Sequence, residues 1–151
     1  MIMSQNQIPY RIVQVHIDDF NMKDQPMEEG AKYGVKSNYI FQTQFDQRLI
    51  RCASNYTFVK YDEAILNLQL SCVFEVEPEA YDGMYNEDRS ILTVPEYFCR
   101  YMATIAVGAA RGVIAAKVER TNLENLVLPP INLIDTIQRD TVFNVEEHAN
   151  K

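Results

Sequence analysis

Residues able to support acid–base, nucleophilic or metal chemistry are few in this chain and widely separated. There are two histidines, His16 and His148, and the chain has no GxSxG, HExxH, Walker or GxGxxG motif to position them. His16 falls in the middle of a predicted strand, and His148 lies three residues from the end of the chain, where a side chain lacks the rigid support that catalysis needs. We therefore expect a protein that is not an enzyme and that holds no metal and no cofactor.

The cysteines and the acidic residues do not form a site of standard spacing. Cys52, Cys72 and Cys99 are an odd number without a CxxC pair, which is typical of reduced, buried thiols rather than of a disulfide framework or a zinc site. Asp18 and Asp19 would point to opposite faces of a regular strand, so we do not expect them to act as a pair. Six acids and no base occur over residues 75–88, a pattern of a solvated surface or of a dock for a basic partner.

Length and composition indicate one globular domain. The 151 residues are 47% hydrophobic and 23% charged, and we expect a single domain over residues 1–151 with frayed ends at 1–7 and 144–151. The net charge of −7 argues against nucleic acid or an anionic membrane as the partner. The N-terminus lacks the pattern of a secretory signal, and the apolar stretch 103–116 is shorter than the roughly 20 residues of a membrane span. These features predict a cytoplasmic protein without membrane insertion.

The hydrophobic pattern predicts strands first and helices last, the order of an α+β domain. Strands are expected over residues 8–20, 35–45, 48–60 and 66–77, and their one-sided alternation is typical of an antiparallel sheet, predicted here as a four-stranded meander. Pro78 should end the fourth strand, and residues 79–94 should form a crossover. A helix is expected from Pro95 to about Arg120. Asn132 should cap a last helix with Leu133, Ile134, Ile137 and, at its limit, Val142 on the apolar side.

Two further features concern packing and surface. Gly108 and Gly112 form a small-residue strip on the long helix, which indicates close packing against another element or another subunit. The chain has sixteen Tyr and Phe residues (nine and seven), and Tyr33, Tyr81, Tyr85 and Tyr97 fall in expected loops. Exposed aromatic grooves beside sheet edges hold extended, apolar segments of other chains, whereas simple filling of the core is the other explanation.

Three stretches of the sequence resemble the SecB-type export chaperones, and the similarity covers most of the chain. YRIVQVHIDDFNM resembles the first strand of that family, and CVFEVEP resembles its fourth strand. The third stretch, VGAARGVIAAKVERTNLENLVLPPINL, matches a family pattern of helix, loop and last helix without gaps. The positions on that pattern are Ala110, Arg111, Val118, Arg120, Leu126, Leu128, Pro130 and Asn132. The chain departs from the family before Ala110, where Phe-Pro-Tyr is usual, in the turn after Arg120, and in its C-terminal tail.

The resemblance implies a SecB-like fold, a four-stranded antiparallel sheet with two C-terminal helices on one face. It also implies a cytoplasmic homotetramer, a dimer of dimers, that holds unfolded precursor proteins without ATP and delivers them to the Sec translocase. By resemblance, Asp19 and Glu75 would contact the motor ATPase SecA. We place the client-binding groove at Tyr81, Tyr85, Tyr97 and Phe98, and the oligomer interface on the long helix at Gly108, Arg111 and Gly112.

Two alternatives remain open at the level of sequence. The first is a dedicated SecB-like chaperone for a single client, such as the antitoxin of a toxin–antitoxin pair. The second is a different class, a small-molecule-binding α+β module or a hot-dog-like acyl-thioester enzyme, in which a long helix also packs on an antiparallel sheet. The missing catalytic pair argues against the enzyme.

Overall fold

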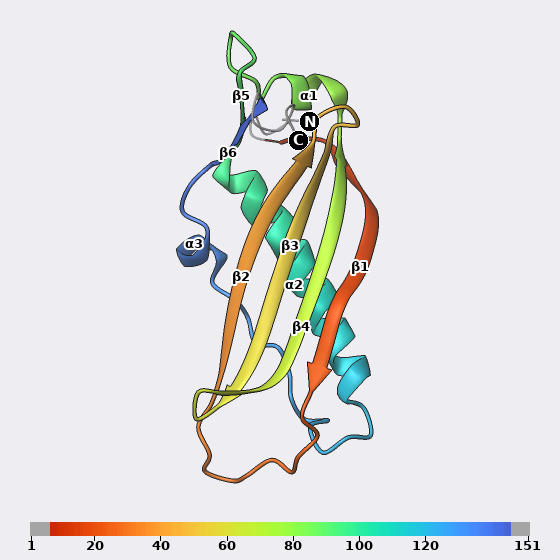
Figure 1. Ribbon diagram of the computed structural model, residues 1–151, viewed down its shortest axis with the longest axis vertical. Helices are drawn as coiled ribbons and strands as arrows, with labels where there is room; N and C mark the ends of the chain where they lie inside the picture. The colour runs from red at the N-terminus through yellow and green to blue at the C-terminus, as the bar shows by residue number, and fades with distance from the viewer. Residues whose placement is uncertain (1–6, 146–151) are drawn as a thin grey trace, which may run out of the picture.

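The computed structural model describes residues 7–145 and has the predicted α+β class, with a four-stranded antiparallel sheet and one long helix laid across it (Figure 1). A small two-stranded sheet lies at one end. The strands and helices in chain order are β1 (Tyr10–Met22), β2 (Tyr33–Gln44), β3 (Leu49–Lys60), β4 (Glu63–Val76), α1 (Pro78–Asp82), β5 (Ile91–Val94), α2 (Glu96–Val118), α3 (Leu133–Thr136) and β6 (Thr141–Asn144).

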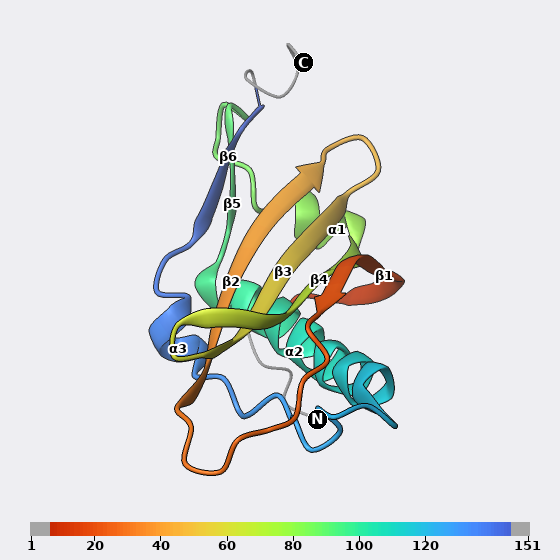
Figure 2. The same cartoon turned by 60° about the horizontal axis from the view of Figure 1, so that its bottom comes forward.

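The order of strands in the sheet is β1-β4-β3-β2, so the predicted meander through all four strands was wrong. Strands β2, β3 and β4 do form a meander, because the tight turns at 45–48 and 61–62 bring each strand back antiparallel beside the one before it. Residues 23–32 are too long for such a turn, and they carry the chain across the end of the sheet, visible in Figure 2. This connection leaves β1 and β2 at the two edges of the sheet.

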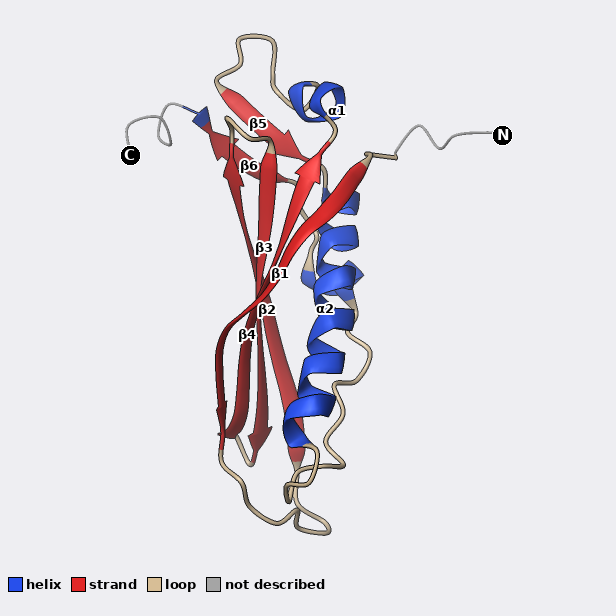
Figure 3. Cartoon of the chain, turned by 90° about the vertical axis from the view of Figure 1, so that its right-hand side faces the viewer, coloured by secondary structure: helices blue, strands red, loops and turns tan. Residues whose placement is uncertain are grey.

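One face of the sheet is covered by α2 and the other carries no helix (Figure 3). In β4 the alternate residues Leu66, Leu68, Leu70, Phe74 and Val76 are buried under α2, as the alternation of this strand predicted. The side chains between them lie on the uncovered face, which we call the open face. The core is therefore a single layer between α2 and the sheet.

Strand β1 is irregular, and this changes the expected direction of its acids. Its pairing with β4 shifts register between Ile12 and Gln14 and again between Ile17 and Asp19. The second shift is a bulge at Asp18. Because of it, the carboxylate of Asp18 reaches Ser71 and Arg51 on the open face, and Asp19 is paired with Gln69, whose side chain lies on that face too. The two acids share one face, so the prediction of opposite faces was wrong.

Helix α2 agrees closely with its prediction. It begins after Pro95, carries Glu96 in its first turn, and ends at Val118 after 23 residues. By length and composition it could span a membrane, since its most apolar 18-residue window has a mean hydropathy of 1.3. The structure instead buries one face of α2 against β3 and β4, the arrangement of a core helix.

The segments on either side of α2 differ from expectation. The crossover at 79–94 contains α1 and β5, and Glu77 caps α1 by accepting hydrogen bonds from the backbone of Glu79 and Ala80. Asn132 does cap a helix, but α3 ends at Thr136, and β6 pairs with β5. The β-branched pair Thr141 and Val142 favours this strand over a longer helix. Asn144 was expected to fray, but as part of β6 it pairs with Ile91 of β5. Of the other residues expected to fray, only Gln7 and Val145 fall within the described part of the chain.

Candidate functional site

After α2 the chain returns along the helix as an extended segment, residues 125–132, which we call the strap. Leu126 and Leu128 are buried toward the core, whereas Val127 between them is 67% exposed. This alternation is that of a strand with one wet face. Pro129 and Pro130 follow and exclude a helix at this point.

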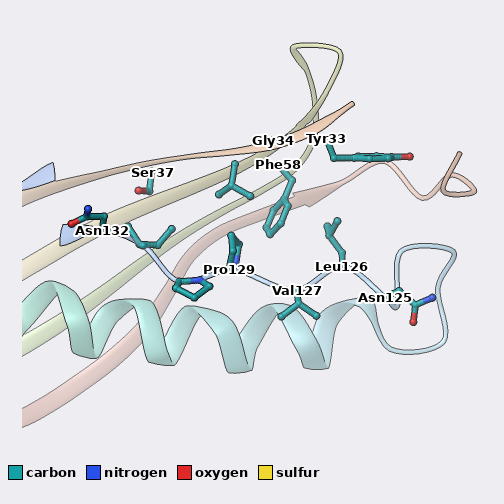
Figure 4. A pocket seen from close by; sticks show the side chains of 12 residues that line it. Tyr33, Gly34, Ser37, Phe58, Asn125, Leu126, Val127, Pro129 and Asn132 are labelled. Carbon is teal, nitrogen blue, oxygen red and sulfur yellow. The ribbon is translucent and has the colours of Figure 1, made fainter. Parts of the chain in front are cut away.

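The strap and β2 enclose a groove of about 600 Å³ (Figure 4). Its lining is apolar or neutral, and no lining residue carries a charge. The lining residues are Tyr33, Gly34, Val35, Ser37, Phe58, Asn125, Leu126, Val127, Pro129, Pro130, Ile131 and Asn132. A groove of this kind suits an uncharged ligand that combines apolar side chains with neutral polar groups.

One wall of the groove is an edge strand. β2 pairs with β3 over its whole length and stands at the end of the sheet. On its other side the backbone N–H and C=O groups of alternate residues therefore face outward beside the groove. An extended chain lying there would find both main-chain partners and an apolar surface for its side chains.

Two arginines of α2 hold the segment that follows the helix. The Arg111 guanidinium donates from Nε to the carbonyl of Leu128 at 2.7 Å and from Nη2 to the carbonyl of Pro129 at 2.9 Å. Arg100 donates from Nη1 to the carbonyl of Ile137 at 2.9 Å, beyond the strap. The strap thus takes its position from α2 through charged donors, which make stronger bonds than neutral ones.

A second hollow, of about 430 Å³, lies on the other side of the strap's end, between α2 and α3. Its lining includes Tyr97 and Tyr101 on α2 and the exposed Ile134. It shares Ile131 and Asn132 with the groove, so the two hollows are neighbours along the strap. Among the predicted groove aromatics, Tyr97 is the one that the structure places at such a surface.

The other predicted groove aromatics lie elsewhere. Tyr81 and Phe98 are buried in the core, so neither offers a surface to a ligand. The Tyr81 hydroxyl lies 2.6 Å from Thr43 Oγ1, and burial raises the pKa of Tyr81 to about 12. Tyr85 is partly buried, and its ring packs against Phe45 and Tyr81. Loop composition had suggested exposure for Tyr81, but α1 turns its side chain inward.

One wall of the groove, the strap, could have been predicted from the sequence by one signal. In Leu126, Val127 and Leu128 the apolar pattern has the period of a strand, and two prolines follow at once. This pattern indicates an extended segment with its own buried side. It does not indicate which part of the molecule faces the other side.

The residues of α2 predicted at the oligomer interface differ in their surroundings. Gly108 and Gly112 are exposed, and a methyl group built on either would meet nothing within 4 Å. The described part of the chain therefore places nothing against this strip. Arg111 is partly buried and engaged by the strap instead.

The predicted partner-binding acids both lie on the open face. Glu75 accepts a hydrogen bond from Arg11 Nε at 2.8 Å, and Asp19 accepts one from Asn21 Nδ2 at 3.0 Å. The neighbouring Asp18 is 3.2 Å from Arg51. The negative charge of this face is therefore partly balanced by cations of the same chain.

The three cysteines are buried, as predicted, and have unreactive surroundings. Cys52 and Cys72 face each other across β3 and β4. Burial raises the pKa of Cys72 to about 11 and raises that of Cys52 further. Within residues 7–145 there is no group of three His, Cys, Asp or Glu side chains placed to hold a metal ion.

The fold is SecB-like. The chain aligns with the SecB-like chaperone Rv1957 of Mycobacterium tuberculosis, solved in complex with a ChAD peptide from the antitoxin HigA1 (Rv1956). The TM-score is 0.53, the identity is 12%, and the alignment covers 81% of this chain and 90% of that one. A protein of unknown function from Streptococcus agalactiae aligns with a TM-score of 0.33 at 10% identity, over 82% of this chain and 99% of that one. No protein-family model and no curated protein matches the sequence.

Proposed function

We propose that this protein is an ATP-independent holding chaperone that binds extended, apolar segments of unfolded polypeptides in the groove between β2 and the strap. The observation that carries this proposal is a groove without charged lining residues, part apolar and part neutral polar, directly beside an edge strand. An extended segment can add to such an edge through its main chain, which makes binding tolerant of sequence. The neighbouring hollow at Tyr97 and Tyr101 extends the surface available to a long client.

The proposed chaperone could serve many clients or a single one. The similar Mycobacterium protein is a SecB-like chaperone bound to an antitoxin peptide, and this supports a dedicated chaperone for one client as the second candidate. General export remains our first proposal, with precursor proteins as clients and with the cytoplasm as the place of action. A pull-down with mass spectrometry separates them, because one dominant client indicates the dedicated role.

Suppression of aggregation tests the proposed function directly. The intact protein should keep a chemically denatured client soluble at stoichiometric ratios, without ATP, and should not hydrolyse acyl-thioesters. An apolar peptide N-methylated at alternate residues on the side that faces β2 should bind more weakly than the same peptide methylated on the opposite side. Thioester turnover without aggregation suppression would instead support the α+β enzyme.

Self-association is part of the proposal, as a tetramer built from two dimers. Strand β1 is an edge strand with exposed apolar side chains, among them Ile12, Val15 and Ile17. A long apolar edge of this kind pairs readily with another chain. The exposed glycine strip of α2 is a second uncovered surface. Val15→Lys should lower the oligomeric state measured by light scattering, whereas Ile40→Lys on the open face of β2 should not; equal behaviour of both variants would contradict this assignment.

Delivery to a SecA-type motor is the finest part of the proposal and rests on Asp19 and Glu75. Both are on the open face, accessible to a basic partner. Reversal of both charges to Lys should leave client holding nearly unchanged, because surface substitutions usually cost less than about 0.5 kcal/mol. It should weaken a salt-sensitive contact with the cognate SecA, whereas Glu87→Lys should not. Wild-type affinity of the double variant at low salt would show that these acids are only a solvated surface.

A further inference from the structure

Arg111 joins the middle of α2 to the strap. Arg111 donates two hydrogen bonds to main-chain carbonyls of the strap, to Leu128 at 2.7 Å and to Pro129 at 2.9 Å. Arg111 does not line the groove itself. These two carbonyls are therefore turned toward α2 rather than into the groove.

The strap has little main-chain capacity left for other partners at this point. Pro129 and Pro130 have no backbone N–H, so they cannot donate to β2 or to a bound chain. The carbonyls of Leu128 and Pro129 are occupied by Arg111. The strap consequently cannot close onto the edge of β2 as a fifth strand through residues 128–130, and a segment bound beside these residues finds its main-chain partners on β2.

We propose that Arg111 is a positioning residue that fixes the strap at its distance from β2 and thereby keeps the groove open. The proposal rests on the proposed function, since it assigns this wall of the groove a side-chain contact and β2 the main-chain pairing. It also gives Arg111 a role within one chain, in contrast to the oligomer-interface role expected from the sequence. Leu126 and Leu128 anchor the strap because their side chains are buried in the core. Arg111 then fixes the position of the backbone that follows them.

Three variants of the full-length protein test this role. Arg111→Met removes both hydrogen bonds and keeps much of the apolar stem, and Arg111→Lys keeps the charge with a donor able to reach one carbonyl. Lys117→Met is the matched control, because it removes a positive charge from the same helix while its contact is with the ring of Phe20 on β1. Each variant is measured by hydrogen exchange with mass spectrometry, by light scattering, and by anisotropy of a fluorescein-labelled, uncharged Val/Leu/Thr peptide.

The expected result is confined to the strap. Arg111→Met should speed amide exchange of strap residues about tenfold or more, since two charge-assisted hydrogen bonds are lost, while exchange in β3 and β4 stays unchanged. Peptide affinity should fall by about tenfold, Arg111→Lys should restore part of both effects, and Lys117→Met should show neither. The oligomeric state should be the same in all four proteins.

Other results overturn the proposal in distinguishable ways. Unchanged strap exchange in Arg111→Met would show that the strap does not depend on this residue. A loss of affinity together with dissociation of the oligomer would assign Arg111 to the interface instead. If the wild-type protein binds no peptide, the proposed chaperone function fails, but the exchange measurement still decides whether Arg111 positions the strap.

Discussion

Val127 offers a direct test of the groove, because it lines the groove and is 67% exposed. Replacement by Asp should barely affect folding, since an exposed substitution usually changes the free energy of unfolding by less than about 0.5 kcal/mol. In the complex the effect should be large. Full burial of a Val side chain is worth roughly 1.5–3 kcal/mol, and about two-thirds of that is still available to a bound client.

The carboxylate adds a second cost. Placing a charged group against an apolar client without a partner costs at least about 1–3 kcal/mol more. Together the two effects amount to roughly 2–5 kcal/mol, which corresponds to a loss of affinity of at least about thirtyfold. Anisotropy of a labelled apolar peptide measures the affinity, and suppression of client aggregation measures the consequence.

Ile40→Asp is the matched control for Val127→Asp. Ile40 is 60% exposed and β-branched like Val127, and it lies on β2, but it points to the open face rather than to the groove. The control should bind the peptide as tightly as the wild-type protein. Equal effects of the two substitutions, or an affinity of Val127→Asp within a factor of about three of wild type (a difference of roughly 0.65 kcal/mol), would refute the assignment of the groove.

Three further predictions concern the strap, the buried cysteines and an ion pair that supports the fold. Leu128→Ala should lower the free energy of unfolding by about 2–4 kcal/mol because Leu128 is only 1% exposed. Val127→Ala should change the free energy of unfolding by less than about 0.5 kcal/mol. Chemical denaturation measures both variants, and equal midpoints would contradict the role of Leu128 as a buried anchor. Ellman's reagent near pH 8 should find no rapidly reacting thiol in the native protein and all three after unfolding, because the cysteines are buried and the pKa of Cys72 is raised to about 11. Arg48 forms a two-point ion pair with Asp82, which lowers the pKa of that carboxyl, so the pair should stabilise the fold above the ordinary value of 3.8 and lose this contribution as the pH falls through the lowered value. Asp82→Asn should therefore lower the denaturation midpoint at pH 7 but not at a pH where Asp82 is protonated; a constant difference between the two proteins would contradict the ionic origin.

Local patterns predicted those features that depend on neighbours in the sequence. The alternation of Leu66 to Val76 identified β4 and the face of Glu75, because side chains of a strand alternate whatever lies beyond it. Pro95 and the apolar run after it identified α2 to within a few residues. The same reasoning predicted that Asn132 caps a helix, which the structure confirms.

Only the tertiary structure determined which elements meet. Pairing of β1 with β4 depends on how residues 23–32 cross the end of the sheet, and the bulge at Asp18 depends on the register with β4. The short sheet of β5 and β6 joins segments about fifty residues apart, so no local pattern could distinguish β6 from a longer helix.

The groove illustrates the same division within one site. The apolar period of Leu126 to Leu128 and the two prolines after it are a local signal for an extended segment, but this segment was not predicted from the sequence. That this segment lies beside the free edge of β2, and that Arg111 holds its carbonyls, depends on contacts across long stretches of chain. Such contacts depend on the free energy of the whole packed core, which the sequence of a single segment does not reveal. For the same reason the sequence did not show that Tyr81 and Phe98 lie in the core rather than in the groove.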